Sequence, residues 1–125
     1  MTIKEVSEKY GISQDTLRYY ERVGVIPDVK RTSGGIRNYS DEDLRWVCLA
    51  KCMRNSGLPL EMMVRYVQLT KEGEKTIPDR MQLLIEQRDA LIAQKNQIDE
   101  AIERLNNNIA RYEARIAEGA AQKSK

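Results

Sequence analysis

The sequence predicts a mainly α-helical protein in which a head of short helices precedes one long C-terminal helix. Three observations lead to this fold class. Two short helical patterns near the N-terminus are each followed by a glycine, Gly11 and Gly24, and glycine commonly ends a helix. A basic stretch over residues 25–39 contains a proline and a glycine pair. From Ile77 onwards, apolar residues alternate in steps of three and four, which is typical of a coiled coil.

The head begins with two helices arranged as a helix-turn-helix. We expect the first over Ile3–Lys9 with Thr2 as its N-cap, and the second over Gln14–Val23 with Ser13 as its N-cap. The second helix carries basic and phenolic side chains close to its start. A short helix, a turn with glycine and a second helix of this kind are how a helix-turn-helix enters the DNA major groove. The sequence therefore predicts a DNA-binding head.

A basic hairpin is expected after the second helix. Pro27 prevents the helix from continuing, and Gly34-Gly35 is a hairpin signal between two extended runs. A basic hairpin directly after a helix-turn-helix is typical of a wing. We expect the helix start to approach base edges, and the cations and phenols to contact phosphates. The predicted DNA-binding residues are Gln14, Thr16, Arg18, Tyr19, Arg22, Lys30, Arg31, Arg37 and Tyr39.

A plainer interpretation of the same residues stays open. In it, the arginines of the second helix form a solvated face with Asp15 and Glu21, and the hairpin is an ordinary surface turn. The charge distribution is compatible with either interpretation. The first 75 residues hold 13 basic and 11 acidic side chains, and the remainder hold eight of each. The order of the elements, rather than the small basic excess, favours DNA binding.

Two further helices complete the predicted head, which we place at 1–74. Ser40 followed by three acids is a strong helix start, and this helix is expected to end near Asn55. Its apolar residues fall on nearly all sides, so it needs cover from more than one direction. A fourth helix is predicted over Glu61–Lys71.

The long helix is predicted over 76–118 and should mediate dimerisation, while residues 119–125 are expected to form a disordered tail. Too little protein remains in the chain to cover its apolar seam, so a second copy is the simplest partner. Arg88 and Lys95 fall at inward positions of the seam and should fix register or orientation. The predicted dimerisation residues are Leu84, Leu91, Ile98, Ile102, Leu105, Ile109 and Tyr112.

Composition argues against several classes of protein. The chain has no histidine, which excludes catalysis or metal binding through that side chain. We find no nucleophile–base pair, glycine-rich phosphate loop or supported carboxylate pair, so we expect no enzyme, no cofactor and no bound metal. No secretory signal is present, and no apolar run approaches the roughly 18 residues that cross a bilayer. We therefore expect a cytoplasmic protein with reduced thiols and no membrane partner.

The two cysteines lie four residues apart in the third helix. Cys48 and Cys52 alone cannot complete a metal site, and a disulfide between them would strain the helix. Lys51 and Arg54 neighbour Cys52, and nearby cations favour the reactive thiolate. A free cysteine more often serves as a small buried apolar residue. The residues alone therefore favour packing for both thiols over reactivity.

Five short motifs in the first 60 residues form a specific pattern. They are SQDTLRYYE (13–21), GVIP (24–27), GIRNY (35–39), and DL (43–44) with GLPL (57–60). Together with the long helix that follows, they resemble the MerR family of bacterial transcription regulators.

This resemblance implies a winged helix-turn-helix head and a homodimer joined by an antiparallel coiled coil. It also implies double-stranded promoter DNA and RNA polymerase as partners. In the family, the dimer underwinds a promoter whose spacer is too long for polymerase, and an effector gates that distortion. Arg18 and Tyr19 would contact the DNA backbone from the recognition helix, and Arg37 and Tyr39 from the wing.

The resemblance also narrows the expected signal. The metal-sensing branch has cysteine ligands at the start and just past the end of the long helix, and residues 76–79 and 119–125 contain none. The large C-terminal drug-binding domain of another branch is absent as well. What remains is similar to short members that respond to aldehydes, electrophiles or nitrosative stress through one thiol. Their reactive cysteine lies in a segment like 51–58, which implies Cys52 as the sensor and leaves Cys48 as packing.

Two other functions stay open. In one, a regulator of the same type senses a small organic ligand in a pocket between the head and the long helix, lined by Trp46, Met53, Met62 and Met63. In the other, the chain is a coiled-coil adaptor whose head binds protein. Unchanged DNA binding after Arg18→Ala would favour the adaptor.

Overall fold

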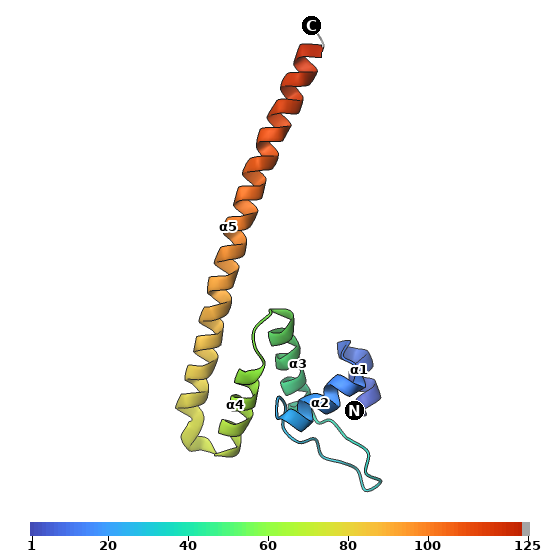
Figure 1. Ribbon diagram of the computed structural model, residues 1–125. Helices are drawn as coiled ribbons and strands as arrows, with labels where there is room; N and C mark the ends of the chain where they lie inside the picture. Colours follow the sequence, from blue (N-terminus) through green and yellow to red (C-terminus); the bar gives the residue numbers. More distant parts are fainter. Residues whose placement is uncertain (124–125) are drawn as a thin grey trace. The chain divides into compact units, whose positions relative to one another are not determined.

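The computed structural model describes residues 1–123, in two units: a head, residues 1–85, and a second unit from residue 86 onwards (Figure 1). The elements are α1 (Ile3–Tyr10), α2 (Gln14–Val23), α3 (Asp41–Asn55), α4 (Glu61–Lys71), the short 3-10 helix η1 (Glu74–Thr76) and α5 (Ile77–Lys123). The mainly helical fold class is therefore confirmed.

Hydrogen bonds at the helix starts explain why the helices begin where the sequence predicts. The Thr2 hydroxyl accepts from the Glu5 N–H at 3.2 Å, and the Glu5 carboxylate accepts from the Thr2 N–H at 2.9 Å. Ser13 caps α2 in the simpler way, through the N–H of Thr16. Ser40 and Asp43 repeat the reciprocal pattern at α3. Each cap satisfies backbone donors that a helix leaves free at its start.

Two helix ends differ from the prediction. α1 continues to Tyr10, because Gly11 takes the left-handed conformation (φ 66°) only after it. α5 continues to Lys123, whereas we expected a disordered tail from residue 119. A glycine inside a helix costs only about 1 kcal/mol relative to alanine. Gly119 is followed by two alanines, so one glycine does not end α5. The predicted tail otherwise comprises residues 124 and 125, which lie outside the described residues.

The predicted wing is a loop, held by one isolated antiparallel bridge between Arg31 and Arg37. No strand is assigned within residues 1–123. The Gly35 N–H bonds to the Thr32 carbonyl at 2.9 Å, and the Thr32 N–H bonds to the Ile36 carbonyl at 2.7 Å. The turn therefore spans residues 32–35, with Gly35 in the left-handed conformation (φ 81°). The turn is shifted by one residue from the expected glycine pair, because Gly35 is the last of its four residues and not one of the two central ones.

The core lies entirely in the head. α3 runs through it and buries Trp46, Val47, Ala50 and Met53, as its apolar residues on nearly all sides predicted. The other helices and the loop cover these side chains. The fully buried residues with the largest side chains are Leu17, Ile26, Met63, Val6, Val47 and Val67.

A compact hydrogen-bonded corner joins α4 to α5 through η1. The Thr76 hydroxyl, which is buried, lies 2.6 Å from the Leu69 carbonyl oxygen and 2.7 Å from that of Gly73. The Arg80 guanidinium donates to the Thr76 hydroxyl at 2.9 Å and to the Gly73 carbonyl at 2.6 Å. These contacts satisfy carbonyls that α4 leaves free at its C-terminal end.

The second unit consists of α5 alone and leaves its apolar seam exposed. Ile98, Leu105 and Tyr112 are 51%, 61% and 62% exposed. Nothing else in the described part of this unit packs on them. No helix of residues 1–123 combines the length and the apolar character that crossing a membrane requires.

Candidate nucleic-acid interface

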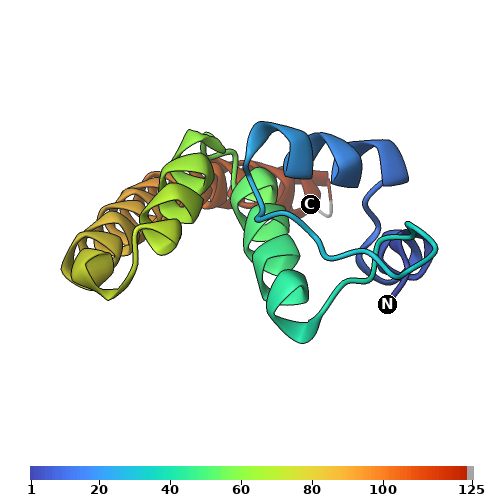
Figure 2. The ribbon, with the colours of Figure 1, turned by 90° about the horizontal axis from the view of Figure 1, so that it is seen from below.

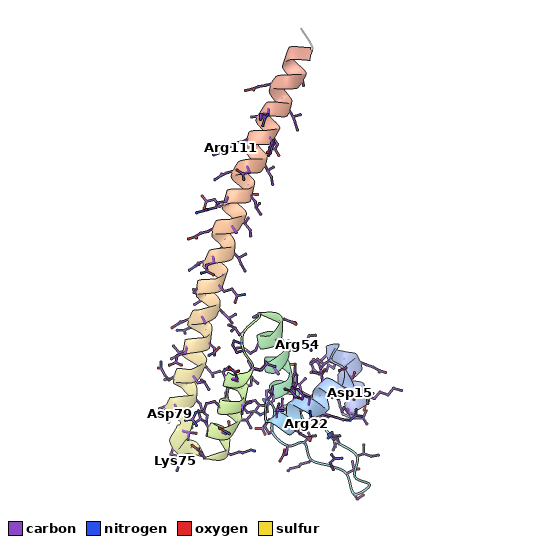
Figure 3. The ribbon with its side chains drawn as sticks, viewed as in Figure 1. Asp15, Arg22, Arg54, Lys75, Asp79 and Arg111 are labelled. Atoms are coloured by element: carbon purple, nitrogen blue, oxygen red, sulfur yellow. The ribbon has the colours of Figure 1, made fainter. Side chains whose placement is uncertain are left out.

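The predicted recognition helix α2 is oriented by two buried side chains. Leu17 and Tyr20 are 0% and 2% exposed and lie three residues apart on one face. Their burial turns the opposite face outwards, and Arg18, Tyr19 and Arg22 are exposed there. The helix therefore presents cations and a phenol to solvent. Asp15 and Arg22 stand near its two ends (Figure 3).

Arg18 is held by neighbours on its own helix. Its guanidinium bonds to the Asp15 carboxylate at 2.9 Å and to the Gln14 side-chain oxygen at 3.3 Å. The Arg18 side chain is still 45% exposed and that of Asp15 is 96% exposed. An ion pair this exposed contributes little stability, so Arg18 can exchange Asp15 for another anion at small cost.

Tyr19 and Arg22 form a second exposed pair. The Arg22 guanidinium lies over the Tyr19 ring, 5.3 Å from its centroid. Tyr19 is 48% exposed. This contact holds both side chains in one arrangement while leaving the hydroxyl and guanidinium donors accessible.

Thr16 has a local role that the sequence prediction did not include. Its hydroxyl accepts a hydrogen bond from the Ser13 hydroxyl at 2.7 Å, and its N–H donates to the same Ser13 oxygen at 3.1 Å. Thr16 therefore helps to cap α2. It remains half-buried, so base contact would use only part of its surface.

An ion pair fixes the wing against α2. The Nε of Arg37 lies 3.1 Å and 3.4 Å from the two carboxylate oxygens of Glu21. The two side chains are only 19% and 12% exposed. Arg37 was predicted as a DNA contact; in the structure its Nε is engaged within the head, and the DNA contact stays a prediction. Glu21 was predicted only as a possible solvated partner of nearby arginines. The pair spans 16 positions, so sequence alone gave no signal for it.

The base of the wing is tied to the start of the chain. The Tyr39 N–H donates to the Met1 carbonyl at 2.8 Å, and the Met1 nitrogen donates to the Tyr39 carbonyl at 2.9 Å. The loop passes close to the N-terminus in Figure 2. Together with the Arg37–Glu21 pair, these bonds hold the wing at two places.

Tyr39 corrects one sequence-based expectation. It was predicted to contact the DNA backbone, but its side chain is 2% exposed and its hydroxyl is buried without a hydrogen-bond partner. Burial raises the pKa of the Tyr39 hydroxyl above its usual value, and the Glu21 carboxylate adds to the shift. The residue offers DNA no surface and serves as core, because the aromatic ring closes the head beneath the wing.

The remaining wing cations are exposed. Lys30 and Arg31 both lie at the surface. The Arg31 guanidinium donates to the Gly35 carbonyl at 2.9 Å, which ties it across the turn. The wing thus presents one unattached ammonium group and one guanidinium with donors to spare.

The two cysteines differ in their surroundings. Cys52 is exposed near the end of α3, whereas Cys48 is half-buried. The Cys48 side chain lies beside Tyr10 of α1, and this neighbour, together with burial, raises the pKa of the Tyr10 hydroxyl. Cys48 therefore packs between helices, while Cys52 is accessible to a reagent. Arg54, two positions after Cys52, stands near the end of the same helix (Figure 3).

A cavity of about 580 Å³ lies beside Trp46, between the loop after α2, the start of α3 and the end of α4. Pro27, Val67 and the Trp46 ring contribute apolar surface, and Asp28 and Lys71 contribute charge. The pocket expected from sequence also included three methionines. Met53, Met62 and Met63 are instead 4%, 8% and 0% exposed, in the core. Only Trp46 of that predicted set lines this cavity.

Comparison with known sequences identifies the family. The model of the MerR HTH family regulatory proteins matches residues 1–70. The chain belongs to the MerR family. It is 47% identical over 92 residues to the HTH-type transcriptional regulator AdhR of Bacillus subtilis, covering 74% of this chain. The match spans 66% of AdhR, just under two thirds of that protein.

Other relatives and solved structures match over nearly the whole chain. An uncharacterised HTH-type transcriptional regulator of Haemophilus influenzae is 33% identical over 119 residues, 95% of this chain and 88% of its own. A putative MerR regulator from Listeria monocytogenes has a TM-score of 0.86 at 43% identity, covering 90% of this chain and 86% of that one. HiNmlR, a MerR regulator lacking the sensor domain, was solved bound to promoter DNA. It has a TM-score of 0.81 at 33% identity and covers 94% of both chains.

Proposed function

We propose that this MerR family regulator binds promoter DNA as a homodimer, distorts it to control transcription by RNA polymerase, and responds to reactive electrophiles through Cys52. The observation that carries DNA binding is the exposed cationic and phenolic face of α2 beside a wing fixed by Arg37 and Glu21. The promoter-bound relative HiNmlR supports the same assignment. The exposed seam of α5 supports the homodimer.

The DNA contacts are tested with single substitutions on a duplex that the protein itself selects from random sequences. Arg22→Ala should weaken binding about tenfold and reduce the salt slope by about one, because one phosphate contact is lost. Arg104→Ala in the second unit is the matched control and should leave both quantities unchanged. Binding that survives both Arg18→Ala and Arg22→Ala would instead favour a head that binds protein.

Exposure supports Cys52 as the residue that reacts with electrophiles. Its thiol lies at the surface, whereas Cys48 is partly covered and lies beside Tyr10. In the proposed step, the Cys52 sulfur adds to the carbonyl carbon of an aldehyde and the thiol proton passes to the carbonyl oxygen. The added group enlarges the end of α3 and can alter how the head engages DNA.

The sensor assignment is tested by transcription from the selected promoter with and without an aldehyde. Cys52→Ser should abolish the response and keep DNA binding, while Cys48→Ser should keep both. Mass spectrometry of the treated protein should place the adduct on Cys52. A response that persists in Cys52→Ser would end the sensor assignment without affecting the DNA-binding one.

The cavity beside Trp46 favours a second candidate, in which a small organic ligand is the signal. Its volume falls within the range of ligand pockets. Trp46 is the only tryptophan, so its fluorescence reports occupancy directly. A saturable change with a candidate effector, retained in Cys52→Ser, would favour the pocket over the thiol.

A further inference from the structure

The seam of α5 in the second unit contains two cations among apolar residues. Written as a heptad abcdefg, the seam uses positions a and d. Arg88 and Lys95 occupy a positions, and neither is buried. The apolar seam residues of this unit are Leu91, Ile98, Ile102, Leu105, Ile109, Tyr112 and Ile116.

A parallel pair of such helices would bring like charges together. In that arrangement each a position faces the same position of the second copy. Arg88 would meet Arg88, and Lys95 would meet Lys95, inside the seam. An antiparallel pair avoids this, because each a position then lies level with a d position and beside an e position of the second copy. The e positions therefore decide which antiparallel register suits the two cations.

The e positions change from apolar to polar along the helix. They are Ile92, Asp99, Asn106 and Glu113. Sliding one helix along the other by one heptad keeps a and d positions level with each other. Each such slide gives a new register and moves the twofold axis by about 3.5 residues along the chain. Two of these registers, with the axis between Asn96 and Gln97 or at Glu100, give the inward cations polar neighbours.

With the axis between Asn96 and Gln97, each Lys95 lies level with Ile98 and beside Asp99 of the second copy. Two reciprocal ion pairs then form next to the axis. Further from the axis, Ile92 lies beside Ile102 and Asn106 lies beside Arg88. Apolar side chains therefore meet apolar ones, and polar side chains meet polar ones. With the axis at Glu100, Asp99 lies beside Ile102 instead, and a carboxylate faces an apolar side chain at the centre of the dimer.

Ion pairs within the chain separate the two registers. The Glu100 register would offer Glu113 to Arg88, which already has the Asp89 carboxylate at 3.2 Å, and would leave Lys95 beside the uncharged Asn106. Lys95 and Asp99, by contrast, form no ion pair within residues 1–123. The first register therefore brings together two charges that have no ion-pair partner within residues 1–123.

We propose that two copies of this chain pair antiparallel with the axis between Asn96 and Gln97, and that reciprocal Lys95–Asp99 ion pairs between the copies select this register. The inference rests on the proposed homodimer. The ion pairs set the separation of the two heads along α5, and hence which half-site spacing the dimer fits.

The test uses two single substitutions, Lys95→Glu and Asp99→Lys, purified separately and then mixed. Each variant alone brings like charges together between copies, so its dimer should dissociate about tenfold more readily. In a heterodimer, the new carboxylate at 95 faces the new ammonium at 99, and the native pair faces across the other side. The heterodimer fraction, measured by native mass spectrometry, should rise from the statistical half to above about 80%.

This design isolates contacts between copies. Positions 95 and 99 also neighbour each other within one helix, but in both variants that internal pair carries like charges, in the heterodimer as in the homodimers. The matched control is a mixture of Glu100→Lys and Arg104→Glu, a pair with the same spacing outside the seam. Its heterodimer fraction should stay at one half.

The outcomes separate the register from the dimer itself. A heterodimer fraction of one half for the Lys95→Glu and Asp99→Lys mixture, with both variants still dimeric, would overturn the proposed register. A wild-type protein that is monomeric at micromolar concentration would overturn the proposed homodimer on which the register rests.

Discussion

At the residue scale, the pair Glu21 and Arg37 changes how an acid on the recognition helix should be understood. An isolated carboxylate near DNA repels phosphates, so neutralising it normally tightens binding. Glu21 is 12% exposed and holds Arg37 of the wing at 3.1 Å. The acid therefore acts on DNA indirectly, by fixing the position of the wing.

We predict that Glu21→Gln weakens DNA binding about three- to tenfold and lowers the free energy of unfolding by about 1–2 kcal/mol, because a charged hydrogen bond is lost. Fluorescence anisotropy and urea denaturation measure the two effects. Glu8→Gln, an exposed acid on α1, is the matched control and should change neither. Tighter binding by Glu21→Gln would show that the acid only repels DNA.

Removing the Tyr39 hydroxyl should not lower stability, in contrast to the Glu21→Gln substitution. This buried hydroxyl has no hydrogen-bond partner, so Tyr39→Phe should leave stability unchanged or raise it by about 1 kcal/mol. DNA affinity should not change. Because folding raises the pKa of this hydroxyl above 10.0, the folded state favours the protonated form. The wild type therefore loses stability as the pH rises past 10.0, and Tyr39→Phe should lose less. A drop in DNA affinity in Tyr39→Phe would instead show that the Tyr39 hydroxyl contributes to DNA binding.

At the element scale, the helix starts could be predicted because their causes are local. Thr2, Ser13 and Ser40 cap helices through residues three positions away, a spacing that is visible in the sequence. The burial of Tyr39 and the engagement of Arg37 could not be predicted, because their partners lie 16 or more positions away. Local patterns therefore indicated which side chains α2 exposes, whereas the contacts that hold the wing left no local signal, and the DNA contacts themselves stay a prediction.

The corner between α4 and α5 also depends on contacts that no local pattern signals. Thr76 and Arg80 satisfy the end of α4. We predict that Thr76→Val, which keeps the shape but removes the hydroxyl, lowers the free energy of unfolding by about 1–3 kcal/mol, because the Leu69 carbonyl and the Arg80 donor lose their partner. Urea denaturation followed by Trp46 fluorescence measures the loss.

Thr70→Val is the control for this prediction. The Thr70 hydroxyl bonds to the Tyr66 carbonyl at 2.9 Å, one turn back in the same helix. Such a bond adds little, because the helix already satisfies that carbonyl, and the loss should stay below about 0.5 kcal/mol. Equal losses for the two valine variants would mean that the corner has no special role.

At the scale of the whole molecule, the head contains the hydrophobic core, and the second unit carries the exposed seam through which we propose that two copies pair. Every residue of the buried core lies in the head, so the head can remain folded when the seam of α5 is changed. The seam itself buries little within one chain. Its sequence pattern predicted a partner helix for this reason, since a single chain could not account for a sustained heptad.

This division makes the contribution of dimerisation to DNA binding measurable. We predict that Ile102→Asp gives a monomer in sedimentation experiments, because it places a carboxylate among the apolar side chains of the seam, while Trp46 fluorescence stays native. Affinity for the two-half-site duplex should fall about 100-fold, because one head then binds without the effective concentration that a linked second head provides. Ala110→Asp, on the exposed side of α5, should remain dimeric and bind normally. A monomeric Ile102→Asp that kept full affinity would show that one head suffices for recognition.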